Sequence, residues 1–359
     1  MLPISKIFNS ASIAVNRTEA ASNRIPYMGE SFFPNRKKIG LDLKWIKTHK
    51  GLGVALKPSN FDAIPTIRPR GRASLSKEEM PMFRESRIVK ENDIMELSRI
   101  QDAGDVYLQP VLDDMYDDTN DLLDGAEIAK ERMRMQLLSA NGGNMGISIA
   151  TADNMVHFFD YDQDGEWKKT HYMELTGDAT WDKPTTAKPL TDIRTAYQYL
   201  TSIGITPVYS LCTSNTFDYL AENQQIRDAL ATLSGNPINF MDMETTEEVY
   251  RRKTKLTPVL YDKMFIDYDG TEKKFYPDGY ITIMGNGQLG NTWHGTTPEE
   301  MTVRGNFPDA PVDITVLDSG VAVAVQTEYK PSFTITTTVS QISLPSFEGI
   351  DSIFVIKVK

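Results

Sequence analysis

Residues 119–141 read TNDLLDGAEIAKERMRMQLLSAN and show the clearest periodicity in the chain. Their apolar side chains recur at every third or fourth position, which aligns them on one stripe of an α-helix. The residues of this stripe are Leu122, Ala126, Ala129, Met133 and Leu137. Asp118 or Thr119 can cap the start of such a helix, and Gly142 with Gly143 is typical of its end. We therefore predict a helix over 119–141 with one buried face.

Upstream, residues 37–88 carry the pattern of a long two-stranded loop. KIGLDLKWI (38–46) alternates apolar and polar residues, which indicates a strand, and LGVALKP (52–58) indicates a second one. Proline and glycine then punctuate a basic stretch that contains three arginines, namely Arg68, Arg70 and Arg72. Because this stretch has no apolar run able to build a core, we expect a protruding loop. Long loops of this kind are usually functional or disordered.

Two further segments adjoin this loop. Residues 1–36 are rich in Asn, Ser, Arg and Pro and have weak periodicity, so we expect an extended arm without its own core. Such an arm becomes ordered only by lying on other parts of a protein. On the other side, IVKENDIMELSRI (88–100) presents a fair apolar face and is expected to be helical.

Downstream of residue 143 the pattern changes to grouped strands and grouped helices. MGISIA (145–150), MVHFFDY (155–161) and EWKKTHYMEL (166–175) read as strands, and a polar linker follows. An α/β unit then begins at 191, where we expect helices over 191–204, 215–233 and 245–255 around the buried strand TPVYSLCTS (206–214). Thr191 and a capping box from Thr245 or Thr246 to Glu248 are the expected starts of two of these helices. The last quarter reads as strands, so the fold class is α+β.

Length and composition limit the classes of protein to which this chain can belong. The chain has 359 residues, enough for one large or two modest domains, and 40% of them are hydrophobic. It has no run of eighteen apolar residues, so no membrane association is expected. The single cysteine, Cys212, allows no internal disulfide, which fits a reducing interior.

Charge is distributed unevenly along the chain. Residues 1–90 contain 17 Lys and Arg against 7 Asp and Glu, while residues 91–359 contain 21 against 42. This asymmetry has three interpretations: chance clustering of solvated charges, a basic arm that lies on an acidic neighbour, or a nucleic-acid surface. The net negative charge of residues 91–359 disfavours the nucleic-acid surface. A basic loop and an acidic body on one chain are self-complementary in a head-to-tail ring.

Two motifs suggest ligands, and both lack a required part. DYDQDG (160–165) matches the first half of an EF-hand loop, but the twelfth position is His171 instead of a bidentate Glu. We therefore expect a hairpin turn there. GNGQLG (285–290) matches a dinucleotide fingerprint, but the sequence after it is not helical, so we expect a glycine-rich loop. Because no metal, cofactor or nucleophile motif is complete, we predict no metal, no cofactor and no catalytic residue.

Taken in order, several segments resemble the major capsid protein E family, the lambda-like branch of tailed-bacteriophage capsid proteins. The segments that carry the resemblance are FFPNRKKIGLDLKWIKTHKGLGVAL (32–56), FRESRIVKENDIMEL (83–97), FIDYDGTEKKFYPDGYITIMGNG (265–287) and PSFEGIDSIFVIKV (345–358). Each is individually weak, and the weight comes from their order. The resemblance implies the Hong Kong 97-like fold.

The resemblance also implies a division of the chain. Residues 1–36 would be the N-arm and 37–88 the extended E-loop. Residues 89–188 with 332–359 would form the peripheral domain, whose spine helix is 119–141, and residues 189–331 would form the axial domain. Arg68, Arg70, Arg72, Trp45 and Leu52 are the candidate subunit-interface residues.

A major capsid protein that forms pentamers and hexamers of an icosahedral head is the function that the resemblance implies, in the virion capsid and assembled in the host bacterial cytoplasm. Its partners would be further copies of itself, a scaffolding protein, a portal protein and packaged double-stranded DNA without sequence-specific contacts; a decoration protein is left open. Two alternatives remain at this point. One is an encapsulin-like cellular shell of the same fold, and the other is a soluble enzyme or nucleic-acid-binding domain.

Overall fold

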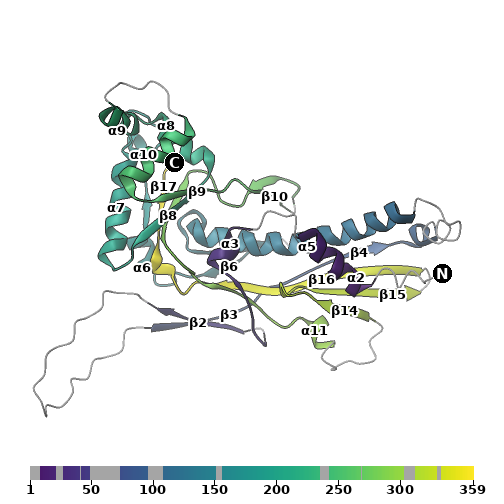
Figure 1. Cartoon of the computed structure of the whole chain (residues 1–359). Coiled ribbons are helices and arrows are strands. Elements are labelled where there is room, and N and C mark those ends of the chain that lie inside the picture. The colour runs from purple at the N-terminus through teal and green to yellow at the C-terminus, as the bar shows by residue number, and fades with distance from the viewer. Residues whose placement is uncertain are drawn as a thin grey trace, which may run out of the picture. The chain divides into compact units, whose positions relative to one another are not determined.

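A computed structural model describes residues 9–21, 27–40, 42–48, 73–95, 108–150, 156–234, 242–267, 269–302, 312–329 and 333–359 (Figure 1). The chain divides into two compact units. Unit 1 contains 1–43, 77–131 and 291–346, and unit 2 contains 44–76, 132–290 and 347–359. Among the described residues, no helix has the length and apolarity needed to cross a membrane.

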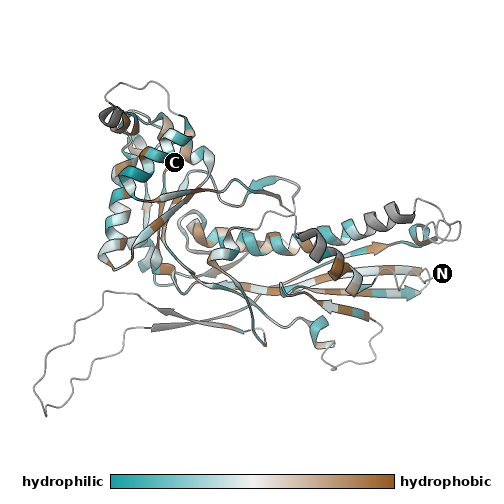
Figure 2. Cartoon of the chain, in the orientation of Figure 1, coloured by the Kyte–Doolittle hydropathy of each residue, from teal (hydrophilic) through white to brown (hydrophobic). Residues whose placement is uncertain are grey.

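Unit 1 is built on a six-stranded sheet centred on the long strand β16. The strand order is β1 (Asn35–Lys37), β13 (Asn291–His294), β16 (Phe333–Ser346), β15 (Ala322–Tyr329) and β14 (Val312–Val316), and β4 (Met82–Val89) also pairs with β16. All pairs are antiparallel except β1 with β13. Burial alternates along residues 334–339 of β16, as expected for a strand with one buried face, whereas β15 begins with apolar residues and ends with mostly polar ones (Figure 2).

Helices cover one face of this sheet. α2 (Ser10–Ala21) and the N-terminal part of α5 (Leu108–Leu138) supply apolar side chains to a core shared with β15 and β16 (Figure 1). The buried members of this core are Ile13, Ile94, Leu122, Leu123, Ala126, Val321, Val323, Val325, Ile335 and Val339. The Leu122–Ala126 part of the predicted stripe thus faces the sheet.

Unit 2 is built on a five-stranded sheet in the order β7 (Tyr172–Glu174), β17 (Ile353–Lys357), β12 (Tyr280–Gly285), β8 (Pro207–Cys212) and β9 (Thr257–Leu260). Four helices gather around it, namely α7 (Pro189–Ser202), α8 (Ser214–Glu222), α9 (Gln224–Ser234) and α10 (Met243–Thr254) (Figure 1). Their apolar faces share one core with Ile281, Ile283, Phe354 and Ile356 of the sheet.

Shorter elements complete the two units. They are α3 (Gly29–Phe32), β2 (Asp42–Thr48), β3 (Ala73–Glu79), η1 (Ala140–Gly143), β5 (Gly146–Ala150), β6 (Val156–Asp160), α6 (Glu166–His171), η2 (Gly177–Ala179), β10 (Met264–Ile266), β11 (Glu272–Lys274), α11 (Pro298–Met301) and η4 (Ile350–Ser352). β2 pairs with β3, β5 with β6, and β10 with β11, each as a separate two-stranded sheet.

The predicted central helix is present, but its bounds differ. α5 begins at Leu108, not near 119, and Pro110 lies in its first turn, where the proline nitrogen has no intrahelical partner to lose. The helix ends at Leu138, and after Ser139 the four residues 140–143 all have positive φ, with 52° at Ala140 and 93° at Gly143. Glycine at 142 and 143 therefore ends the helix as expected.

Other local predictions were wrong. Residues 82–89 form β4, and helix occupies only 91–95 of the predicted 88–100, of which 96–100 lie outside the described residues. Residues 10–21 of the expected extended arm are helical, because Ile13 gains burial against the sheet. The segment 166–175 is α6 followed by the short strand β7, because Asp162 caps the backbone of that helix.

Two helix starts also differ from prediction. α7 begins at Pro189, without a side-chain cap from Thr191, and α10 is capped by Asp242, whose carboxylate accepts from the Thr245 amide at 3.0 Å. The predicted helix over 215–233 is two helices, α8 and α9, separated at Asn223. The strands predicted for 206–214 and for the last quarter are confirmed as β8, β14, β15, β16 and β17.

Candidate functional site

The predicted loop is described only at its root. β2 and β3 pair and flank residues 49–72. Leu52, Arg68, Arg70 and Arg72 lie outside the described residues, and of Trp45 only the backbone, within β2, is described. The five predicted interface residues are therefore not brought together by any described contact.

Leu43 and Met80, at the two ends of this root, belong to unit 1. Leu43 at the start of β2 and Met80 after β3 are both buried. Beside them, the Lys38 amide donates to the His294 carbonyl at 2.8 Å, and the Lys37 ammonium lies 2.6 Å from Glu300 of α11. Burial and these polar contacts therefore fix the residues of unit 1 that flank β2 and β3.

Strand β4 follows this root and is fixed on both of its faces. Arg84 reaches Glu299 of α11 at 2.5 Å, and the same carboxylate accepts from Ser340 of β16 at 2.7 Å. On the other face, Arg87 bonds to Asp118 and lies 3.5 Å from Asp121, both on α5. β4 is thus tied to a helix on each side of the sheet as well as to β16 by eight residue pairs.

The sheet face that turns away from α5 is the candidate assembly surface of unit 1, and we call it the open face. Because side chains alternate along a strand, Ile335 and Val339 point to α5, and their neighbours in sequence point outward. The open face carries Met82, Arg84, Ser86 and Ile88 from β4, Thr334, Thr336 and Thr338 from β16, and Gln326 and Glu328 from β15. Met82 and Ile88 are 42% and 58% exposed.

Such a surface suits contact with another protein. Exposed apolar side chains among hydroxyl groups and paired charges are typical of interface patches. Sequence reasoning missed this surface because residues 82–88 were assigned to the protruding loop and residues from 88 onward to a helix, whereas 82–89 form β4 of the sheet. The signal was the alternation in FTITTTVS (333–340), which places threonines on the outward side.

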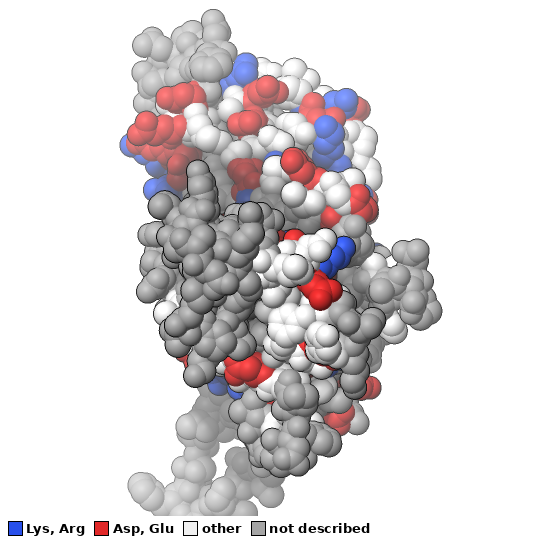
Figure 3. Space-filling model, turned by 90° about the vertical axis from the view of Figure 1, so that its right-hand side faces the viewer, with Lys and Arg blue, Asp and Glu red and all other residues white. Residues whose placement is uncertain are grey.

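Acidic side chains are widespread on the described surface. Asp117, Asp118 and Asp121 are all exposed along α5, and Arg87 is the basic partner of the last two. Figure 3 shows Asp and Glu side chains spread over one face of the molecule, with Lys and Arg side chains between them. The negative charge predicted for residues 91–359 is therefore presented to solvent, where it acts at long range on other charged surfaces.

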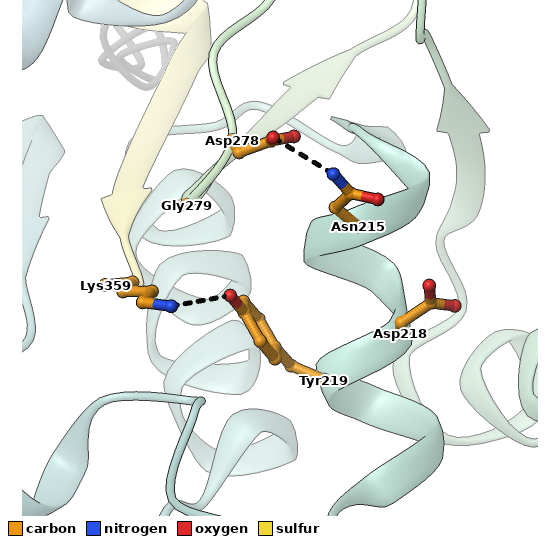
Figure 4. A pocket seen from close by; sticks show the side chains of 6 residues that line it. All are labelled: Asn215, Asp218, Tyr219, Asp278, Gly279 and Lys359. Carbon is orange, nitrogen blue, oxygen red and sulfur yellow. Dashed lines mark hydrogen bonds between the residues drawn. The ribbon is translucent and has the colours of Figure 1, made fainter.

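Unit 2 has an open hollow of ≈ 510 Å³ lined by Asn215, Asp218, Tyr219, Asp278, Gly279 and Lys359 (Figure 4). Its polar groups largely satisfy one another. Asn215 donates to Asp278 at 3.1 Å, and Lys359 donates to the Tyr219 hydroxyl at 3.1 Å. Asp278 also accepts from Thr213 at 2.5 Å and from Lys274 at 2.9 Å. These bonds fix the start of α8 to the chain before β12, which is a structural role.

The acidic motif at 160–165 is a helix cap. Both carboxylate oxygens of Asp162 accept backbone amides, from Trp167 and Lys168, each at 2.9 Å. Gly165 has a φ of 67°, which allows the chain to turn into α6. Among the described residues, no group of three or more His, Cys, Asp or Glu side chains is arranged to hold a metal ion.

The glycine motif at 285–290 joins two strands. β12 ends at Gly285 and β13 begins at Asn291, so the described chain after the motif is extended. A dinucleotide fold needs a helix there, whose N-terminus receives the pyrophosphate. The predicted glycine-rich loop is confirmed.

The single cysteine of the chain is buried. Cys212 lies in the core of unit 2, where burial raises the pKa of its thiol, with the nearby Asp262 carboxylate adding to the shift. A buried neutral thiol is a poor nucleophile. Cys212 therefore belongs to the packing of unit 2.

Comparisons with known proteins identify a family and a fold. The family model described as phage major capsid protein E matches residues 14–331. A protein of Escherichia coli CFT073, assigned as the capsid protein of a prophage, is 11% identical with a TM-score of 0.57, over 98% of this chain and 99% of that one. A phage-related protein from Bordetella bronchiseptica RB50 is 12% identical with a TM-score of 0.54, over 96% and 95% of the two chains. No curated protein sequence matches.

The two solved structures show a shared fold over nearly the whole of each chain, and the family model covers most of the sequence. The resemblance found in the sequence is therefore confirmed, and the mixed α and β architecture is that of a phage capsid protein. The chain belongs to the phage major capsid protein E family.

Proposed function

We propose that this protein is the major capsid subunit of a tailed phage, which self-assembles as pentamers and hexamers into an icosahedral head around double-stranded DNA. The family match over residues 14–331 carries the proposal. The fixed loop root and the open face of unit 1 support it, because a shell subunit must present rigid surfaces to several copies of itself. It acts as a structural protein without catalysis.

The proposal assigns a role to each part of the chain. Residues 1–36 are the N-arm and 37–88 the E-loop, which reaches a neighbouring subunit through Arg68, Arg70, Arg72, Trp45 and Leu52. Residues 89–188 with 332–359 form the peripheral domain, and 189–331 form the axial domain at the centre of each capsomer. The basic loop is expected to dock on an acidic neighbouring subunit, since opposite charges steer association and set register.

The proposed partners follow from this role. Copies of the chain assemble with a scaffolding protein and a portal protein in the host bacterial cytoplasm, and the finished shell belongs to the virion. The packaged DNA makes no sequence-specific contacts. A decoration protein, where one exists, would bind the outside of the assembled shell.

Assembly is the decisive test. The purified chain, alone and with the scaffolding protein of the same phage, should form closed particles of uniform diameter in electron micrographs. The control is the same chain in low-concentration urea, which weakens apolar contacts before it unfolds the subunit. A stable monomer in light scattering under every salt and scaffold condition would refute the proposal. Particles that enclose a cargo protein instead of nuclease-resistant DNA would favour a cellular compartment.

A further inference from the structure

The glycine motif at 285–290 contains a dipeptide with a reactivity of its own. Asn286 is followed by Gly287, and only one other asparagine of the chain, Asn141, is followed directly by glycine. Glycine has no Cβ to shield its backbone nitrogen. The nitrogen after such an asparagine can therefore attack the side-chain carboxamide, and asparagine is among the thermolabile residues of proteins.

The surroundings of Asn286 leave both reacting groups accessible. Residues 286–288 are exposed between the end of β12 at Gly285 and the buried Leu289. Among the described residues, neither the Asn286 carboxamide nor the Gly287 amide forms a hydrogen bond. A Cβ added at Gly287 would meet no atom within 4 Å, so there is room around the attacking nitrogen.

The two flanks of this exposed segment are held by the rest of unit 2. A Cβ added at Gly285 would lie 3.3 Å from the Ile205 side chain, so the end of β12 is closely packed. On the other flank, the Leu289 carbonyl accepts from the Gly349 amide at 2.7 Å. A rearrangement at Asn286 is therefore confined to the three exposed residues between these contacts.

Asn141 has the same neighbour in sequence but is held in place. It lies in η1 with a φ of 40° and a ψ of 53°, and its Nδ2 donates to the Ser148 hydroxyl at 2.8 Å. The same turn is closely packed, because a Cβ added at Gly143 would lie 2.9 Å from the Tyr172 ring. Attack by the next nitrogen on the Asn141 carboxamide would have to break this hydrogen bond and reshape a packed turn.

We propose that Asn286 is a site of spontaneous deamidation in the folded subunit and that Asn141 is protected. The Gly287 nitrogen forms a bond to the Cγ atom of Asn286 and loses its proton, and the Nδ2 group leaves with that proton as ammonia. Water then opens the resulting succinimide at either of its two carbonyl groups, which gives aspartate or isoaspartate at position 286. The reaction consumes water, releases ammonia and involves no oxidation or reduction.

Either product changes the connection between β12 and β13. Both add a negative charge to an exposed segment, and covalent changes of charge alter how a surface meets other charged groups. Isoaspartate also inserts an additional carbon atom into the backbone. Subunits would therefore acquire a permanent chemical difference with age. The inference does not depend on the proposed shell function, because it concerns the chemistry of a single chain.

Mass spectrometry of the aged protein tests the proposal. The purified full chain is incubated at mildly alkaline pH, and fragmentation of the tryptic peptides 275–304 and 135–168 locates any conversion of a carboxamide to an acid. We expect Asn286 to convert at least tenfold faster than Asn141 in the folded chain, and the two to convert at similar rates in concentrated urea. Equal rates in the folded chain, or a faster reaction at Asn141, would overturn the proposal.

Two variants at the same position complete the test. Asn286→Gln keeps the carboxamide but would require a larger ring, so the conversion in peptide 275–304 should be lost while the slow rate at Asn141 stays the same. Asn286→Asp carries the charge of the product from the start, and the acidic form of the aged wild-type chain should migrate with it in isoelectric focusing. An acidic form that persists in aged Asn286→Gln at the wild-type level would place the modification elsewhere and refute the assignment.

Discussion

At the scale of single residues, two glycines in the α5 region have opposite requirements. Gly125 lies within the helix, and an added Cβ would meet nothing within 4 Å. Gly143 has a φ of 93°, and an added Cβ would lie 2.9 Å from the Tyr172 ring. The first position therefore tolerates alanine and gains helix propensity, whereas the second requires glycine for both its dihedral and its packing.

We predict opposite signs for the two alanine substitutions. Gly125→Ala should raise the free energy of unfolding by about 0.5–1 kcal/mol, because alanine restricts the unfolded chain and favours helix. Gly143→Ala should lower it by about 2–4 kcal/mol through the left-handed backbone and the clash. Urea denaturation of the unassembled subunit measures both, and equal effects of the same sign would contradict this account.

Asp162 shows how a ligand-like motif can be structural. Asp162→Ala should lower stability by about 1 kcal/mol, since two amides at the start of α6 lose their acceptor. Asp162→Asn keeps one acceptor oxygen and should lose less. Calcium should leave the wild-type melting temperature unchanged, and a calcium-dependent rise that Asp162→Ala abolishes would restore the metal interpretation.

The Asp278 carboxyl should make the stability of the subunit depend on pH. Burial raises its pKa, but hydrogen bonds from Thr213, Lys274 and Asn215 outweigh burial, so its pKa lies below the ordinary value. A carboxyl whose folded pKa is depressed contributes stability above its unfolded pKa of about 4, and this contribution is lost as the pH falls through the folded value. Asp278→Asn should therefore destabilise the subunit at pH 7, and the difference from wild type should shrink below pH 4. A difference that is constant from pH 7 to pH 3 would show that the charge is irrelevant.

At the scale of elements, α2 is held by few but specific contacts. Ile13 is its buried apolar anchor, the Ser10 amide donates to Asp313 at 2.7 Å, and Arg17 lies 2.7 Å from Asp124. A helix of twelve residues is marginal in water without tertiary contacts. The folding of α2 should therefore depend on its packing against the rest of unit 1.

Ile13→Ala should detach α2 from the core of unit 1 and allow it to unfold. The loss of a buried isoleucine costs about 2–4 kcal/mol, and hydrogen exchange of residues 10–21 should become fast while the rest of unit 1 stays protected. Val15→Ala is the matched control, because Val15 is 60% exposed and its truncation removes little buried surface. Retained protection of 10–21 in Ile13→Ala would mean that the polar contacts suffice.

The sequence predicted elements better than their pairing. The stripe that begins at Leu122 and the alternation in β16 are local patterns, and both elements are present. The pairing of β1 with β13 and of β4 with β16 joins residues at least 246 positions apart in the sequence, and no local pattern specifies it. The open face was missed for this reason, since a strand has an outward side only once its neighbours are known. The start of α10 at Asp242 was missed because several acids and threonines compete as caps.

At the scale of the whole molecule, the main feature is the uneven distribution of charge along the chain. Residues 1–90 have a net charge of +10, and residues 91–359 have −21. Some basic side chains of the first segment are paired within the chain, as Arg84 is with Glu299 and Arg87 with Asp118. Arg68, Arg70 and Arg72 belong to the part of this segment that leaves the fixed root of β2 and β3, so they are the ones we assign to a neighbouring subunit.

The triple substitution of Arg68, Arg70 and Arg72 by Glu tests that assignment. Arginine binds a carboxylate through two parallel hydrogen bonds, yet each exposed pair contributes only about 0–1 kcal/mol. Three pairs per subunit, repeated around a ring, still bias it toward closure, and reversing their sign replaces attraction by repulsion. We expect the triple variant to fold, with native circular dichroism and an unchanged urea midpoint, and to form few or misshapen particles in electron micrographs. The triple Lys variant is the control and should assemble at low salt, because charge is kept while the paired geometry is lost. Normal particles from the triple Glu variant would show that the asymmetry is incidental, and that apolar residues such as Trp45 and Leu52 attach the loop to its neighbour.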